Sequence, residues 1–178
     1  MLKKNNFKIF LILLILFIFF ALFFSFQYKV TVLRAVESRD ENILWEKNIA
    51  NENSFIIKYL HSVARTEVKE FFEIRDGEFF LTGTEYQSYG AGLPVNTEGQ
   101  YILKDDKFII KDIDYKIDML LLRISDSSQH ELIYQENRYP LYELTGSNAL
   151  IEFRTEKLSY FKFLTQEVKK WLNLKKQN

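Results

Sequence analysis

The sequence predicts a mainly β fold, either an antiparallel β-sandwich or a partly closed barrel, with an N-terminal transmembrane helix and a short C-terminal amphipathic helix. Patterns in three parts of the chain predict the β domain and the two helices that flank it. Short runs of alternating or apolar residues, separated by turn residues, follow one another through the middle of the chain. An uncharged apolar segment precedes them, and a segment with helical spacing follows.

The N-terminal segment from Ile9 to Phe26 contains no charged residue and is dominated by Leu, Ile and Phe. As a helix it would span ~27 Å, which is one membrane crossing. A cleaved signal peptide would have a shorter apolar region and small residues at both cleavage positions, which residues 23–27 do not offer. We therefore expect residues 1–28 to form an uncleaved, single-pass anchor in membrane lipid.

Lysines at positions 3, 4 and 8 precede this anchor, and no acidic residue accompanies them. The positive-inside bias then predicts a cytoplasmic N-terminus and an outer domain at residues 29–157 on the far side of the membrane. The chain has no Cys, so a lipoprotein anchor and disulfides are excluded. Its 24 basic and 24 acidic residues give no reason to expect nucleic acid as a partner.

The outer domain is long enough for one hydrophobic core. Its expected strands are Val30–Ala35, Ile43–Lys47, Phe55–His61, Val68–Ile74, Phe79–Glu85, Tyr101–Leu103, Phe108–Ile110, Met119–Ile124, Glu131–Tyr134, Leu141–Leu144 and Ala149–Phe153. The continuous apolar run at Met119–Ile124 predicts a buried central strand. Pro140 suggests that the strand after it lies at an edge.

The clearest local signal is the hairpin around Asp76-Gly77, a two-residue turn flanked by alternating apolar positions. Pairing outward from this turn without a bulge puts Glu70 opposite Gly83 and Val68 opposite Glu85. Glu70 and Glu85 would then lie on the inner face as diagonal neighbours, where each carboxylate needs a partner or solvent. The candidate partners nearest in sequence are Arg65, Lys69 and His61.

Polar residues and a glycine loop stand at the two ends of this hairpin. The candidate ligand- or partner-binding residues are His61, Ser62, Arg65, Thr66, Glu70, Glu85, Ser88, Gly90, Ala91, Gly92, Leu93 and Pro94. The loop lacks the third glycine of a dinucleotide fingerprint, and it instead favours a chain reversal whose backbone N–H groups can bind an anion.

Recognisable catalytic and metal-binding patterns are missing from the sequence. Ser62 beside His61 is not a catalytic pair, because adjacent strand residues point to opposite faces. His61 and His130 are far apart in sequence and no Cys accompanies them, so we expect neither a metal nor a cofactor.

The centre of the chain resembles a bacterial family called domain of unknown function 1850. The residues that carry the resemblance are Tyr59, His61, Ser62, Val63, Thr66, Val68, Glu70, Phe72, Tyr86, Ser88 and Gly90–Pro94. Members of that family occur beside, or fused to, membrane subunits of tripartite periplasmic-type (TRAP) solute transporters of the TAXI class. The resemblance implies a domain over about residues 43–155 that acts as an extracytoplasmic accessory of solute uptake.

Three functions remain open. In the first, the domain assists TRAP-type transport, and Arg65, His61 and the glycine loop engage an anionic solute or an acidic side chain of a partner, with Glu70 orienting Arg65. In the second, a hydrolase or isomerase uses His61 and Glu70 as acid and base. In the third, the motif is purely structural, and His61 bonds to the backbone in the glycine loop.

The C-terminal segment, residues 158–178, is a basic amphipathic tail. Its apolar residues at helical spacing are Phe161, Leu164, Val168, Trp171 and Leu172, and its lysines at other positions are Lys162, Lys169, Lys170, Lys175 and Lys176. We expect a helix packed on the sheet. The alternative is a helix at the membrane interface, with its lysines near anionic lipid.

Overall fold

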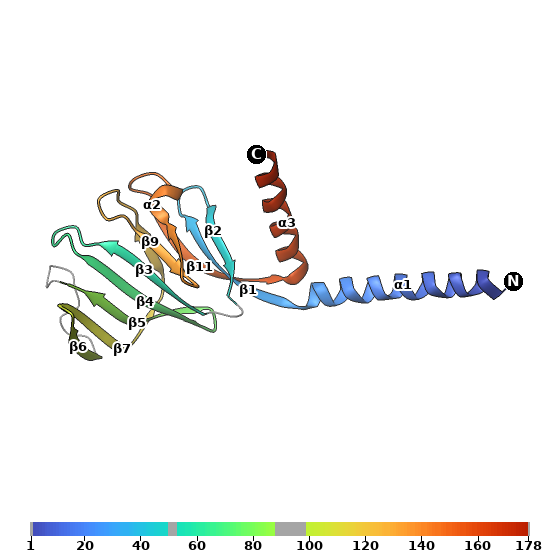
Figure 1. Ribbon diagram of the computed structural model, residues 1–178, viewed down its shortest axis with the longest axis horizontal. Helices are drawn as coiled ribbons and strands as arrows, with labels where there is room; N and C mark the ends of the chain where they lie inside the picture. The colour runs from blue at the N-terminus through green and yellow to red at the C-terminus, as the bar shows by residue number, and fades with distance from the viewer. Residues whose placement is uncertain (1, 50–52, 88–98, 178) are drawn as a thin grey trace. The chain divides into compact units, whose positions relative to one another are not determined.

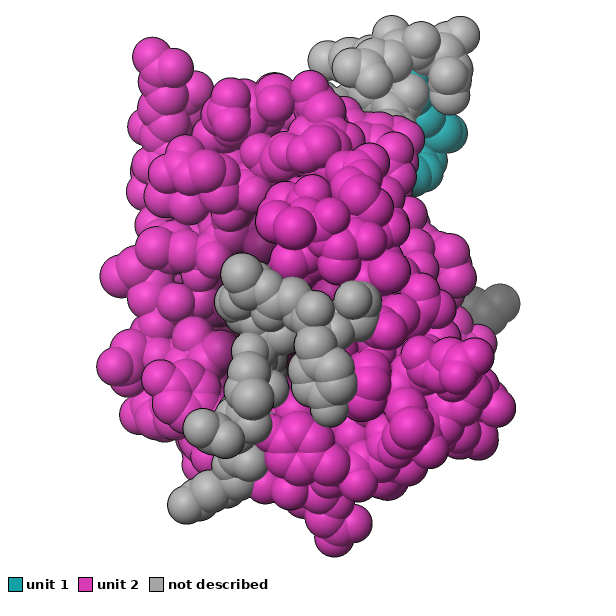
Figure 2. All heavy atoms as spheres, turned by 90° about the vertical axis from the view of Figure 1, so that its left-hand side faces the viewer, with its two compact units in different colours: residues 1–31, 157–178 teal, residues 32–156 magenta. Residues whose placement is uncertain are grey.

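The computed structural model describes residues 2–49, 53–87 and 99–177. Residues 32–156 form one compact unit, coloured magenta in Figure 2. Residues 1–31 and 157–178 form the other unit.

Two antiparallel sheets make up the β domain, as Figure 1 shows. The smaller sheet has the strand order β2-β1-β11-β8. Its strands are β1 (Lys29–Glu37), β2 (Asn42–Asn48), β8 (Leu120–Arg123) and β11 (Leu150–Ser159).

The larger sheet has seven strands in the order β10-β9-β3-β4-β5-β7-β6. Its strands are β3 (Ser54–Leu60), β4 (Glu67–Arg75), β5 (Glu78–Tyr86), β6 (Gln100–Lys104), β7 (Lys107–Ile117), β9 (Glu131–Tyr134) and β10 (Asn137–Pro140). The sandwich alternative of the sequence prediction is therefore confirmed, and the described strands do not close into a barrel.

Aromatic side chains join the two sheets in the core. Phe55 of β3 stacks on Phe72 of β4 with ring centroids 5.2 Å apart, and on Phe153 of β11 at 5.7 Å. Trp45 of β2 meets Tyr134 of β9 edge to face at 5.5 Å. The Phe55–Phe153 and Trp45–Tyr134 contacts each link a strand of one sheet to a strand of the other, and they hold the two layers together.

The hairpin at Asp76-Gly77 forms as predicted, with both turn residues at positive φ. Beyond Leu81, however, a bulge at Thr82 shifts the register. Glu70 therefore lies opposite Thr84 rather than Gly83, and Val68 lies opposite Tyr86 rather than Glu85.

Gly83 follows the bulge and lies close to β7. A Cβ built at this residue would lie 3.0 Å from the backbone oxygen of Ile110, so a larger side chain would crowd the two strands. Thr82 donates a hydrogen bond from Oγ1 to the backbone oxygen of Phe71 at 3.1 Å. The prediction that Glu85 shares the inner face with Glu70 was therefore wrong.

Two further strand predictions need correction. Residues Leu141–Leu144 form a short helix, α2, because Pro140 ends β10 and the chain then turns to bury Leu141. The backbone N–H of Leu141 donates to the carbonyl of His130 at 2.9 Å. The apolar run that contains β8 lies at the edge of the smaller sheet rather than at its centre, and its residues Met119 and Leu121 are exposed.

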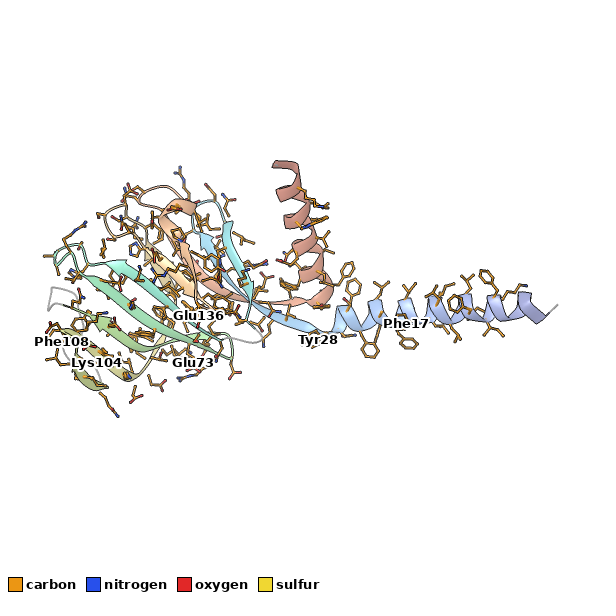
Figure 3. The ribbon with its side chains drawn as sticks, viewed as in Figure 1. Phe17, Tyr28, Glu73, Lys104, Phe108 and Glu136 are labelled. Carbon is orange, nitrogen blue, oxygen red and sulfur yellow. The ribbon has the colours of Figure 1, made fainter. Side chains whose placement is uncertain are left out.

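The second unit contains two helices, α1 (Leu2–Gln27) and α3 (Tyr160–Gln177). The segment Phe7–Gln27 of α1 is long and apolar enough to cross a membrane, and its side chains, such as Phe17, project freely from the helix (Figure 3). This composition suits a membrane anchor or a signal sequence.

Candidate functional site

The motif turn, which we define as His61–Thr66, connects β3 to β4. His61 closes it through its backbone: its N–H donates to the carbonyl of Thr66, and its carbonyl accepts from the N–H of Arg65, both at 2.9 Å. The His61 side chain caps the same turn. Its Nδ1 accepts from the backbone N–H groups of Val63 at 3.3 Å and Ala64 at 3.1 Å.

The buried imidazole uses Nδ1 as an acceptor, so this nitrogen carries no hydrogen in the capped turn. At a helix N-cap, the side chain of Asn, Asp or Ser likewise accepts hydrogen bonds from the backbone N–H groups two and three residues further on. Through Nδ1, His61 therefore helps to form its own turn. The bond to the glycine loop that the structural hypothesis expects involves residues outside the described segments.

Arg65 lies on the exposed side of the motif turn with a left-handed backbone, φ 54°. Such a conformation is uncommon for a residue with a Cβ and is held here by the hydrogen bonds around it. Its Nη1 donates to the carbonyl of Ser127 at 2.9 Å. Ser62 is also exposed, whereas Thr66 is half-buried. The turn thus presents a hydroxyl and a guanidinium to solvent from a fixed backbone.

A second group of polar residues, the inner polar cluster, lies on the inner face of the larger sheet. It consists of Tyr59, Glu70, Thr84 and His130. The Tyr59 hydroxyl donates to Oε1 of Glu70 at 3.2 Å. Glu70 is flanked in register by Ile57 and Thr84, both almost fully buried.

The surroundings of Glu70 change its acidity. Burial raises the pKa of this carboxyl, and the hydrogen bond from Tyr59 opposes the rise only in part. The pKa of Tyr59 is also raised, first by burial and then by the negative charge of Glu70. The sequence expectation that Glu70 orients Arg65 does not hold, because the two side chains bond to Tyr59 and to Ser127 respectively.

His130 completes the cluster just before β9. Its ring packs on Tyr59 with centroids 5.3 Å apart. Its Nδ1 is buried and has no hydrogen-bond partner among the residues that the structure describes. Burial lowers the pKa of His130, so the ring is neutral at pH 7.

Glu85 belongs to a different surface, the outer face of the larger sheet. It accepts hydrogen bonds from Lys107 at 2.8 Å and Lys69 at 3.2 Å. Burial raises the pKa of Glu85, but these two hydrogen bonds outweigh it and hold the pKa below its usual value. Lys69 also pairs with Glu67. Glu85 is therefore part of a structural ion-pair network and not a neighbour of Glu70.

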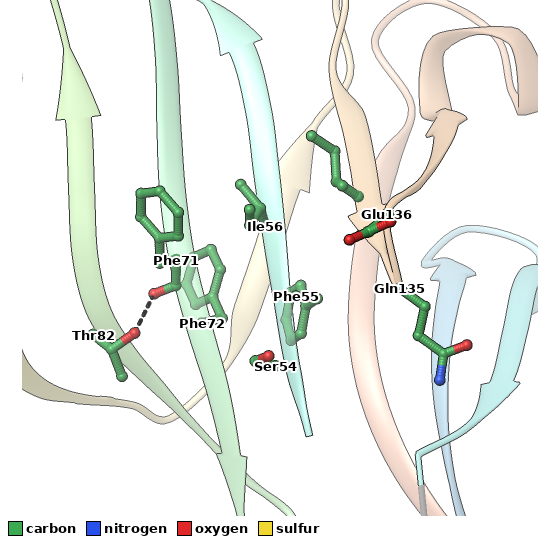
Figure 4. Close-up of a pocket in the computed structure, with 9 residues that line it drawn as sticks. Ser54, Phe55, Ile56, Phe71, Phe72, Thr82, Gln135 and Glu136 are labelled. Atoms are coloured by element: carbon green, nitrogen blue, oxygen red, sulfur yellow. Dashed lines mark hydrogen bonds between the residues drawn. The ribbon is translucent and has the colours of Figure 1, made fainter. Parts of the chain in front are cut away.

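The same outer face carries a surface pocket of about 350 Å³ beside the bulge (Figure 4). Ile56, Phe71 and Thr82 line it from three neighbouring strands, and Gln135 and Glu136 border it from the turn after β9. The pocket is open and mostly apolar, with no titratable cluster among these lining residues. The pocket is concave, but few of its lining groups could bind a polar ligand.

The predicted glycine-loop residues Ser88, Gly90, Ala91, Gly92, Leu93 and Pro94 lie outside the described residues. The structure therefore does not test their prediction. Within the described segments, no group of three or more His, Cys, Asp or Glu residues could hold a metal ion. The acid–base hypothesis places His61 and Glu70 within hydrogen-bond reach. In the structure, Nδ1 of His61 instead accepts from the backbone of its own turn, and Glu70 accepts from Tyr59.

Three members of the inner polar cluster were not predicted as site residues, namely Tyr59, Thr84 and His130. Thr84 reaches the inner face only through the bulge, which the regular alternation did not reveal. His130 precedes β9, a strand whose place beside β3 depends on contacts distant in sequence. Their short-range signal was weak, because one buried histidine or threonine is most often a packing residue.

The fold and these sites define a β-sandwich domain that accompanies an apolar helix able to cross a membrane. The family model described as "Domain of unknown function (DUF1850)" matches residues 55–141, and this match supports the resemblance of the central domain to that family. The match includes almost all of the larger sheet and leaves out β1, β2 and β11 of the smaller sheet. Neither the curated proteins nor the solved structures gave a match.

Proposed function

We propose that this protein is a membrane-anchored, extracytoplasmic accessory of a TRAP-type solute transport system and that its motif turn contacts a membrane subunit of the transporter. The apolar helix α1 supports the anchor, and three lysines before its apolar stretch support a cytoplasmic N-terminus. The transport role is what the family resemblance implies.

The exposed guanidinium of Arg65, held by a fixed turn, is the observation that carries the contact surface. An arginine in a left-handed, hydrogen-bonded turn loses little conformational freedom on binding. Its planar donors suit a carboxylate, with which they form paired hydrogen bonds. Because Arg65 and Ser62 are exposed, an acidic side chain of a protein partner suits them better than an enclosed solute.

The partner is tested by purifying the tagged full chain from its native membrane in detergent. We expect a transporter membrane subunit to co-purify with the wild type and to be lost with Arg65→Gln. The matched control is Arg138→Gln, which removes an exposed arginine on β10. Equal recovery with all three proteins would exclude Arg65 as the contact, and absence of transporter subunits from the wild type would contradict the accessory role.

The role of His61 is separated by two substitutions. Asn can accept from the same backbone N–H groups as Nδ1, whereas Ala cannot. If His61 only builds the turn, His61→Asn should retain the partner and His61→Ala should weaken its recovery. Loss of the partner with both variants, while the domain stays folded, would show that the imidazole itself is recognised.

Membrane orientation is tested with introduced cysteines, since the chain has none of its own. A membrane-impermeant maleimide added to intact cells, or to spheroplasts where an outer membrane is present, should label Ser62→Cys. It should not label Lys4→Cys until the membrane is permeabilised. The reverse pattern would contradict the proposed orientation.

A second candidate function is binding of a carboxylate-bearing solute at the inner polar cluster. The raised pKa of Glu70 favours it, because a protonated carboxyl can donate a hydrogen bond to an anionic group. Calorimetric titration of the purified protein with small carboxylates should then give binding that weakens as the pH rises. Binding unchanged by Glu70→Ala, or absent from the whole series, would count against this function.

A further inference from the structure

Helix α3 starts at the point where the apolar helix α1 ends. The backbone N–H of Tyr160 donates to the carbonyl of Tyr28 at 2.8 Å. The rings of Phe26 and Phe161 stack with centroids 4.5 Å apart, and those of Tyr28 and Tyr160 meet edge to face at 6.0 Å. These contacts lie within one compact unit and tie the first turn of α3 to the last turn of the span.

One face of α3 is apolar and faces solvent. Its exposed apolar side chains are Phe161, Leu164, Val168, Trp171 and Leu172. No α3 side chain that the structure describes is buried. The expected packing of this helix on the sheet stays a prediction. A helix with an uncovered apolar stripe of this size needs another apolar surface to cover it.

The charge of α3 indicates which surface that is. The helix contains five lysines and a single acidic residue, Glu167. Lys162 and Lys169 are exposed, and on a helix they project away from Leu164 and Trp171. The ammonium of Lys175 lies 4.0 Å from the centre of the Trp171 ring. Aromatic residues with basic neighbours are typical of helices at a membrane interface, where the ring lies at headgroup depth.

We propose that α3 lies in the surface of an anionic membrane, next to the point where α1 leaves it. The apolar face enters the boundary between headgroups and acyl chains, and the lysines on the other side contact anionic headgroups. Two observations favour a lipid surface over a protein groove. The first turn of α3 contacts the end of α1, which suits a bilayer, and α3 itself carries an excess of positive charge. This inference rests on α1 acting as the anchor, but not on transport or on the motif turn.

The emission of Trp171 tests this placement in the full chain reconstituted into vesicles. The only other tryptophan, Trp45, is buried in the sandwich. The difference between wild type and Trp171→Phe therefore reports Trp171 without altering the core. A Trp45→Phe chain provides a second, independent reading. We expect lipids brominated near the headgroup end of the acyl chain to quench Trp171 several-fold more than lipids brominated near the methyl end.

The role of charge is tested by lipid composition. Quenching of Trp171 should be stronger in vesicles that contain phosphatidylglycerol than in phosphatidylcholine alone. The double substitution Lys162→Glu and Lys169→Glu should abolish this difference. The control, Lys104→Glu and Lys111→Glu, changes two exposed lysines of the β domain and should leave it intact.

Several outcomes would overturn the placement. Quenching by acrylamide but not by brominated lipid would put Trp171 in water. Protection from both would mean that a second copy or another protein covers the face. Equal lipid quenching with and without anionic lipid would remove the electrostatic part of the proposal. Flotation of the Trp171→Phe chain with the vesicles shows separately whether α1 is inserted, so failure of the anchor is distinguished from failure of α3.

Discussion

The hydroxyl of Tyr59 donates a hydrogen bond to Oε1 of Glu70 across strands β3 and β4, at 3.2 Å. This contact gives a half-buried carboxylate one donor on a face whose flanking residues Ile57 and Thr84 are almost fully buried. Because one neutral donor only partly replaces hydration, the ionised form of Glu70 remains disfavoured and its pKa stays raised. Glu70 therefore reduces the stability of the folded state when it is ionised.

Replacing Glu70 by Gln should increase stability at neutral pH. The folded pKa of Glu70 lies above its unfolded value of about 4.5, so its contribution to stability is complete below pH 4.5 and is lost as the pH rises through the folded pKa. Gln stays neutral and keeps an acceptor for Tyr59. We expect a higher melting temperature than wild type at pH 8, and a difference that shrinks towards pH 4.

Near-ultraviolet circular dichroism of the full chain in detergent measures this melting temperature. Glu136→Gln is the matched control, because it neutralises an exposed carboxylate in a turn. It should change the melting temperature little at either pH. If Glu70→Gln were less stable than wild type at pH 8, the carboxylate would be a structural partner and not a destabilising group suited to a site.

Replacing His130 by Phe should make the domain more resistant to acid. The pKa of His130 is lowered in the folded state, so the folded state disfavours the proton, and stability falls as the pH drops below the ordinary value of 6.5. Phe keeps the ring contact with Tyr59 and removes a buried Nδ1 that has no partner among the described residues. At pH 7 we expect unchanged or higher stability, by up to about 1 kcal/mol.

Urea titrations between pH 7 and pH 5 measure the acid effect of His130→Phe. The wild type should lose stability over this range more steeply than the variant. Parallel loss in both proteins would assign the acid sensitivity to other groups.

Most strands of the sandwich could be predicted because half-buried strands repeat with a period of two residues. The wrong predictions of strand and register have physical causes that a period of two residues does not reveal. The bulge at Thr82 moves the register of β5 on β4 by one residue, and every β5 side chain after it changes face. An apolar residue such as Leu141 suits a strand as well as a helix. Its helical turn is held by the hydrogen bond from its N–H to the carbonyl of His130, which the local sequence does not reveal.

The candidate site was predicted only in part for the same reason. His61, Arg65 and Glu70 were identified from their residue types, but their partners were not. The partners of Arg65 and Glu70, namely Ser127 and Tyr59, come from other segments of the chain. Strand order and register decide these contacts, and a single sequence specifies them only through the complete fold.

Substituting Gly83 by Ala should destabilise the domain by about 1–2 kcal/mol, because the new Cβ would meet a backbone oxygen that is held in the sheet. Gly146→Ala is the matched control, since a Cβ at that residue meets nothing within 4 Å. Its effect should stay within about 0.5 kcal/mol. Urea unfolding followed by tryptophan fluorescence compares the two variants. Equal stability of both would mean that the strand pair beside Gly83 can open without cost.

Substituting Arg34 by Met should be among the most damaging changes on the smaller sheet. Arg34 lies opposite Glu46 on β1 and β2. Its Nε donates to the Glu46 carboxylate at 2.5 Å, and its Nη1 pairs with Glu156 of β11. The Glu46 side chain is only 2% exposed, so loss of its cation leaves a buried charge, at a cost of about 3 kcal/mol.

The double variant Arg34→Met with Glu46→Leu should recover much of this loss, because the buried carboxylate of Glu46 is then removed with its cation, and Glu156 is exposed enough to be hydrated. The control, Arg75→Met, breaks ion pairs with Glu73 and Asp114 that are partly exposed, and it should cost much less. Chemical unfolding of the wild type, Arg34→Met, Glu46→Leu and the double variant gives the coupling between Arg34 and Glu46. If Arg34→Met and Arg75→Met lowered the free energy of unfolding by the same small amount, burial would not strengthen the Arg34–Glu46 pair. The carboxylate of Glu46 would then have to reach solvent when its partner is removed.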